Sequence, residues 1–150
     1  AHYLTNIIGN PLDTTVAMHY LIFGGVLERY PDLKFVLSHG GAFAAAYAGR
    51  MDHAYGARPD CRENISMPPS FYLEKFYPDS LVFTIEQLQY LINRFGADHV
   101  LIGTDYPFDM GEYDPVEHVY QVPGLSSANR DLICGGNALR LMHMTEDECK

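Results

Sequence analysis

Several common catalytic signatures are missing from this sequence of 150 residues. It contains no HExxH, P-loop, GxGxxG or GxSxG motif, so the usual signals of a zinc protease, an NTPase, a dinucleotide-binding enzyme and a serine hydrolase are absent. The three cysteines, Cys61, Cys134 and Cys149, form no CxxC pair, and we therefore expect neither a disulfide framework nor a zinc finger. This sparse cysteine content is typical of a reducing compartment, and a cytoplasmic location is expected.

Positive charge and long apolar runs are also scarce. Ten Lys and Arg residues against nineteen Asp and Glu residues give a net charge of −9, which argues against nucleic acid or an anionic membrane as a partner. No apolar run approaches the roughly 20 residues of a membrane span, and no signal peptide is visible. An apolar content of 47% with 19% charged residues instead indicates a folded globular protein.

The most informative stretch runs from Lys34 to Gly41 and reads KFVLSHGG. Its apolar first half predicts a short buried strand, and the two glycines permit a tight turn and a close approach of the backbone to a ligand. Ligands of α/β proteins bind beyond the carboxyl ends of the strands, so His39 lies where catalysis usually takes place. A histidine that only hydrogen-bonds a loop is the alternative.

A second strand is predicted over residues 100–104, and it ends in Asp105. The imidazole of His39 and the carboxylate of Asp105 are therefore expected at the same end of a sheet, a pair that suits metal binding or acid–base chemistry. An aspartate in this position can also cap the following loop, and that alternative stays open.

Helices are predicted around these strands. One is expected from Asp13 or Thr14 to about Tyr30, weakened by Gly24-Gly25, and others over residues 42–55 and 85–95, the last capped by Thr84. The expected buried face of the first helix consists of Val16, Tyr20, Phe23 and Leu27. Residues 76–79 form a further strand candidate, although Pro78 weakens it. Alternating helices and strands indicate a parallel sheet, and three strands are too few to close one, so the sequence predicts part of a larger α/β fold.

Other titratable residues have ordinary explanations. His53, His99, His118 and His143 are expected at the surface. Arg50, on the helix after His39, is either a solvated arginine or a clamp for a carboxylate.

Several motifs then resemble one family. The segments SHGGAF at residues 38–43, GR at 49–50, LIGTDYPF at 101–108 and GNA at 136–138 are similar to the amidohydrolase-related metal-dependent family, and in particular to its aminocarboxymuconate-semialdehyde decarboxylase-like branch. The resemblance covers nearly the whole chain. It implies that residues 1–150 are the C-terminal segment of a single (β/α)₈ TIM barrel domain.

The resemblance also implies a site. Members of this family hold a divalent metal, with zinc as the expected ion. Asp105 matches the aspartate that binds this metal, and His39 matches the histidine beside the metal-bound water, which acts as general base. Arg50 matches an arginine that reaches the substrate carboxylate of a neighbouring subunit in dimeric decarboxylases, so a small-molecule substrate and a homodimer are expected.

The sequence departs from the family pattern in two places. It has no HxH pair, so the chain alone is expected to bind metal poorly. It also has no tryptophan, and Tyr3 and Asn6 stand where the decarboxylases carry tryptophans. The expected function is non-oxidative decarboxylation of a small carboxylated substrate. Metal-dependent hydrolysis of an amide, ester or lactone is the alternative, as is an inactive truncated fragment.

Overall fold

The computed structural model describes residues 1–149, without the side chains of Glu146 and Cys149. The chain divides into two compact units. The first comprises residues 1–37 and 41–76, and the second comprises residues 38–40 together with the chain from residue 77 onward. Cys61 and Cys134 are free thiols, as the sequence predicts, whereas the expectation for Cys149 falls outside the described side chains.

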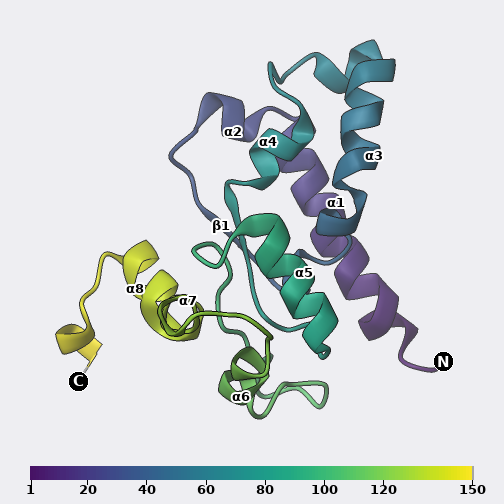
Figure 1. Cartoon of the computed structure of the whole chain (residues 1–150). Coiled ribbons are helices and arrows are strands. Elements are labelled where there is room, and N and C mark those ends of the chain that lie inside the picture. Colours follow the sequence, from purple (N-terminus) through teal and green to yellow (C-terminus); the bar gives the residue numbers. More distant parts are fainter. Residues whose placement is uncertain (150) are drawn as a thin grey trace. The chain divides into compact units, whose positions relative to one another are not determined.

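The first unit is mainly helical (Figure 1). Its elements are a π-helical turn Thr5–Gly9, α1 (Asn10–Phe23), α2 (Val26–Arg29), α3 (Ala44–Ala57), a 3-10 turn Pro59–Arg62 and α4 (Pro69–Leu73). Its buried apolar side chains are Met18, Ile22, Leu27, Leu37, Ala44, Ala45, Ala48, Ile65, Tyr72, Leu73 and Phe76. The helix predicted over residues 42–55 is thus present as α3.

The prediction of one continuous first helix is wrong. Gly24-Gly25 does not merely weaken the helix but separates α1 from α2, because Gly25 adopts a left-handed conformation with φ of 69°. A Cβ atom at Gly25 would lie 2.3 Å from the carbonyl oxygen of Asn64. The close approach of another backbone segment therefore explains this glycine.

The predicted buried face of the first helix is also wrong in part. Met18 and Ile22 are fully buried, whereas Val16 is 41% exposed and Tyr20 is 71% exposed. The helix begins at Asn10 and continues from the π-helical turn. The apolar residues on α1 therefore do not all lie on one side, and helical spacing alone did not identify the buried ones.

Two short strands and one bridge make up the sheet. β1 (Phe35–Leu37) and β2 (Phe76–Pro78) form a two-stranded sheet. The strand predicted over residues 100–104 is reduced to one parallel bridge between Leu101 and Asp79. The ladder does not continue, because the next N–H on this edge, that of Gly103, donates to the hydroxyl of Ser80 at 3.1 Å instead of a strand carbonyl.

The second unit contains α5 (Ile85–Phe95), α6 (Pro115–Tyr120), α7 (Ser127–Asp131), a π-helical turn Leu132–Gly136, α8 (Asn137–Met142) and a 3-10 turn Glu146–Cys149. The Thr84 hydroxyl accepts from the N–H of Gln87, so the predicted cap of α5 is confirmed. Buried apolar residues of this unit are Tyr77, Leu81, Leu88, Leu91, Phe95, Val100, Leu101, Val119, Val122 and Ile133.

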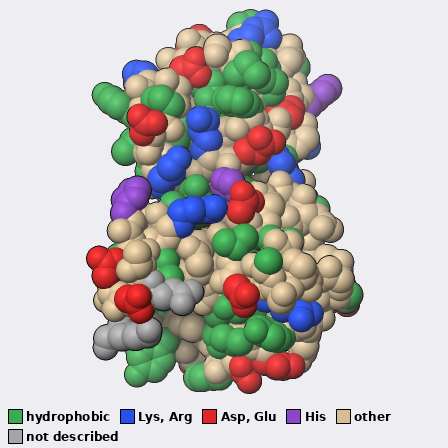
Figure 2. Space-filling model, turned by 60° about the vertical axis from the view of Figure 1, so that its left-hand side comes forward, with side chains coloured by type: hydrophobic (Ala, Val, Ile, Leu, Met, Phe, Trp, Pro, Cys, Tyr) green, Lys and Arg blue, Asp and Glu red, His purple; other side chains and the backbone are tan. Residues whose placement is uncertain are grey.

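Hydrophobic side chains are not confined to these cores. On the face drawn in Figure 2 they gather in patches between acidic and basic residues. Within residues 1–149, no helix has both the length and the apolar character needed to cross a membrane.

Candidate active site

His39 lies directly beyond the carboxyl end of β1, as predicted. Residues 39–42 all have positive φ, from 54° to 70°, so the chain makes a left-handed turn at this point. Nδ1 of His39 is buried and has no hydrogen-bond partner among the described residues. A buried imidazole nitrogen without a partner is costly unless something else binds it, which favours a functional role over a loop contact.

Asp105 follows the bridged segment at Leu101. Its φ is 56°, so it too is a non-glycine residue in the left-handed region. Its carbonyl accepts from the N–H of Phe108 at 2.9 Å, and its side chain is half-buried. His39 and Asp105 therefore share the left-handed conformation, which the chain also adopts at His2, Tyr3, Ala42, Phe83 and His143.

Asp79 is a site residue that the sequence reasoning did not single out. It follows β2, and its Oδ1 accepts from the N–H of Gly40 at 2.7 Å and from the N–H of Leu81 at 3.1 Å. Burial raises the pKa of the Asp79 carboxyl group, and these hydrogen bonds oppose the rise. The rule that found His39, a polar residue directly after a buried strand, would have found Asp79 if Pro78 had not weakened the strand prediction.

The residues that follow β1, β2 and the bridged segment meet at one edge. Asp79 contacts Gly40, the neighbour of His39, and a Cβ atom at Gly103 would lie 2.8 Å from the Cβ of Asp79. All of these residues belong to the second unit. That the side chains of His39 and Asp105 converge on one cleft remains a prediction.

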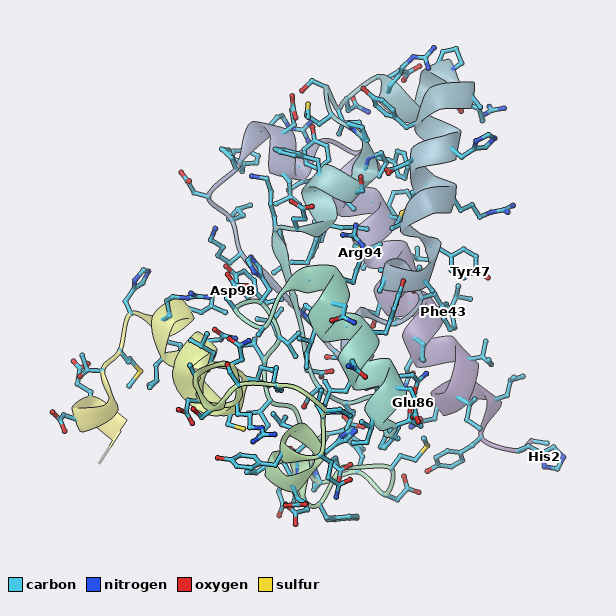
Figure 3. All side chains as sticks on the ribbon, in the orientation of Figure 1. His2, Phe43, Tyr47, Glu86, Arg94 and Asp98 are labelled. Atoms are coloured by element: carbon cyan, nitrogen blue, oxygen red, sulfur yellow. The ribbon has the colours of Figure 1, made fainter. Side chains whose placement is uncertain are left out.

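Arg50 lies on α3 in the first unit and is exposed. It lines a cavity of about 420 Å³ between α1 and α3, which also includes Thr15, His19 and the labelled Phe43 and Tyr47 (Figure 3). The cavity is mostly apolar in its lining, with Arg50 as a cationic group at its wall. The role of Arg50 toward a carboxylate is not tested by this geometry and remains a prediction.

Two of the histidines expected at the surface are not ordinary surface residues. His118 is 8% exposed, and its Nδ1 lies 3.7 Å from a carboxylate oxygen of Glu112. His99 stacks on Tyr77 with ring centroids 4.6 Å apart. His118 lies inside the short helix α6 and His99 in the turn after α5, and neither segment is long enough for sequence periodicity to indicate burial.

The ligand types needed for a metal centre are present, but they do not assemble into one within residues 1–149. Among the side chains that the structure describes, no group of three or more His, Cys, Asp or Glu could hold a metal ion. The described residues therefore do not form a complete metal site by themselves. Asp105 can contribute one carboxylate ligand to such a site.

The comparison with known proteins identifies the family. Residues 8–143 match the family model described as Amidohydrolase. The chain belongs to the amidohydrolase family. A relative from this family, the 2-amino-3-carboxymuconate-6-semialdehyde decarboxylase of Dictyostelium discoideum, is 38% identical over 142 residues, which cover 94% of this chain and 40% of that protein. The chain thus spans about two-fifths of the length of this relative.

Solved structures agree with this assignment. The apo structure of Metarhizium anisopliae IDCase has a TM-score of 0.82 at 25% identity, covering 95% of this chain and 42% of that one. The dihydroxybenzoic acid decarboxylase of Polaromonas sp. JS666, with bound manganese and the inhibitor 2-nitroresorcinol, has a TM-score of 0.75 at 26% identity, covering 89% and 40%. This amidohydrolase chain therefore shares its α/β fold with part of each enzyme, and the resemblance seen in the sequence motifs is confirmed.

Proposed function

We propose that the intact protein is a non-oxidative decarboxylase of a small carboxylated substrate, and that this chain supplies the C-terminal part of its (β/α)₈ barrel. The observation that carries the proposal is the position of His39. It lies beyond the end of β1 on a left-handed turn, with a buried Nδ1 that has no partner among the described residues. The relative at 38% identity, which is named as a decarboxylase, supports the reaction type.

The chemistry requires a proton-transfer group. In a non-oxidative decarboxylation the bond to the carboxylate carbon breaks, CO₂ leaves, and the electron pair that remains on the substrate carbon takes up a proton. Histidine is suited to this task because its ordinary pKa lies close to neutrality. We assign to His39 the handling of this proton, either directly or through a water molecule that it orients.

A divalent metal is part of the proposal. Asp105 would be one of its ligands. Further ligands would come from the part of the relatives' length that this chain does not span. Zinc is the predicted ion, and the manganese in the Polaromonas structure makes manganese the competing identity. Metal analysis of the purified intact protein distinguishes the two.

Arg50 and a second subunit complete the proposal. An exposed arginine on α3 can bind a carboxylate as a bidentate clamp. The π-helical turn and the start of α1 expose apolar side chains, among them Leu4, Ile7 and Leu12, and exposed apolar patches are typical of protein interfaces. We propose a homodimer in the cytoplasm, and sedimentation analysis showing a stable monomer would contradict the dimer.

Three substitutions test the assigned roles in the intact protein, with release of CO₂ from 2-amino-3-carboxymuconate 6-semialdehyde and dihydroxybenzoates as the assay. His39→Ala should lower kcat by about 10²–10⁴-fold while metal content stays nearly intact. Asp105→Ala should lower metal occupancy. Arg50→Ala should mainly raise KM, because it removes a contact made in both the ground state and the transition state.

His53→Ala is the matched control, since His53 is an exposed histidine on α3, and it should leave all three quantities unchanged. Unchanged activity in His39→Ala would refute the proposal. Equal metal loss in His39→Ala and Asp105→Ala would make His39 a ligand instead of a proton-transfer residue.

A further inference from the structure

A single carboxylate lies between the two stretches that carry His39 and Asp105. Oδ1 of Asp79 accepts from the N–H of Gly40 at 2.7 Å, across 39 residues of sequence. The bond to the N–H of Leu81, two residues on, is an ordinary local turn contact. The bond to Gly40 is not local, so a capping role for Asp79 does not explain it.

Asp79 is equally close to the stretch that leads to Asp105. It forms the parallel bridge with Leu101, and a Cβ atom at Gly103 would lie 2.9 Å from Oδ2 of Asp79. The neighbouring Ser80, which is 1% exposed, accepts from the N–H of Gly103 through its hydroxyl at 3.1 Å. Residues 79 and 80 thus contact both segments from the same position.

The turn at His39 needs an external constraint. A non-glycine residue in the left-handed region costs about 1–2 kcal/mol, and such conformations persist only where the surroundings enforce them. The φ of His39 is 57° and that of Gly40 is 62°. The hydrogen bond from the N–H of Gly40 to Oδ1 of Asp79, at 2.7 Å, fixes the peptide unit that follows His39, and its acceptor is a half-buried side chain from a distant part of the sequence.

We propose that Asp79 is a positioning residue, which holds the left-handed turn of His39 at a fixed place relative to the segment of Asp105. This inference rests on the proposed function, because it takes His39 as the proton-transfer residue. Asp79 acts through the backbone of Gly40 and needs no contact with the substrate. A misplacement of His39 by about 1 Å is enough to lower the rate by about 10²-fold.

The test compares Asp79→Ala with Asp79→Asn in the intact protein. Alanine removes the acceptor, so kcat should fall by about 10- to 100-fold while KM and metal content stay close to those of the unchanged protein. Asparagine keeps one carbonyl oxygen, and a single oxygen accepts both hydrogen bonds in the structure. It should therefore restore most of the lost kcat. Asp32→Ala, at an exposed position, is the matched control and should leave kcat unchanged.

A second readout does not depend on activity. Amide hydrogen exchange of the segment containing Gly40 should accelerate in Asp79→Ala and remain slow in Asp79→Asn. If Asp79→Ala does not fold, Asp79→Glu decides, because it moves the carboxylate by one methylene and should lower kcat and accelerate the same amide.

Three results would overturn the inference: full kcat in the folded alanine or glutamate variant, an effect confined to KM, or loss of metal in step with kcat, which would make Asp79 a ligand. Failure of the proposed function is recognised separately. Full activity in His39→Ala refutes the function, whereas the exchange of the Gly40 amide still reports whether Asp79 holds the turn.

Discussion

Gly40→Ala is the substitution for which the structure gives the sharpest expectation. Gly40 has a φ of 62°, and an alanine at this position would adopt a left-handed conformation that costs about 1–2 kcal/mol. The new Cβ atom would also lie 2.3 Å from Cγ1 of Val82 and 2.8 Å from Cδ1 of Leu91. Overpacking of this kind costs about 1–3 kcal/mol.

The two costs act on the same residue, and a contact of 2.3 Å with Cγ1 of the short, branched Val82 side chain requires a shift of more than a few tenths of an ångström. We therefore expect a loss of about 2–5 kcal/mol in the free energy of unfolding. This loss is a large part of the total for a domain, which is about 5–15 kcal/mol. Urea denaturation measures it as a lower midpoint at an unchanged slope.

Gly49→Ala is the matched control on α3. A Cβ atom at Gly49 would meet nothing within 4 Å, and alanine is favoured over glycine inside a helix by about 1 kcal/mol. The same change of residue type should therefore stabilise the protein at position 49 and destabilise it at position 40. A loss below about 1 kcal/mol in Gly40→Ala would mean that the turn is not held in the left-handed region, and the reasoning from strain would fail.

Two further predictions concern stability. Asn137, which is fully buried, donates to the carbonyls of Ala97 at 2.8 Å and Val100 at 2.7 Å; Asn137→Ala leaves both acceptors unpaired and should cost about 2–4 kcal/mol in urea denaturation, against almost no change in exposed Asn93→Ala. Hydrogen bonds from the hydroxyls of Ser66 and Tyr72 lower the pKa of Glu28 from its ordinary value of 4.5. Ionised Glu28 therefore stabilises the fold above pH 4.5, and this stability is lost as the pH falls through the lowered pKa. In Glu28→Gln the denaturation midpoint should depend less on acid pH, and an identical pH dependence in both proteins would contradict the assignment.

Local sequence signals predicted the elements that end at clear boundaries. Thr84 and Gly96 bracket α5, and the structure begins and ends that helix between them. The strand before His39 is present as β1, because a short apolar run followed closely by glycines favours a strand that ends in a turn. The family motifs around His39 and Asp105 are likewise local in sequence, which is why the family could be recognised without any structure.

The features that failed depend on contacts that are distant in sequence. Gly25 adopts its left-handed conformation where Asn64 approaches, and nothing near residue 25 announces that contact. The burial of Met18 instead of Tyr20 on α1 depends on what packs against the helix. The segment predicted as a strand over residues 100–104 also bonds to a distant segment, since the N–H of Ile102 donates to the carbonyl of Ile133. In these cases the partner is distant in sequence, or its location is set by the fold. The periodicity of the local sequence therefore cannot predict the contact.

The edge that carries the candidate site is held mainly by side chains and not by a long strand ladder. β1 and β2 have three residues each, and the third segment is bridged at a single residue. Asp79 accepts from Gly40, Ser80 accepts from Gly103, and Asn137 donates to the carbonyls before Leu101. In a long ladder many backbone hydrogen bonds hold neighbouring strands together. At this edge, each of these hydrogen bonds depends on one polar side chain. Substitutions of Asp79, Ser80 or Asn137 should therefore shift His39 and Asp105, although none of these three side chains needs to contact the substrate. We expect each of them to lower activity through the position of the site residues.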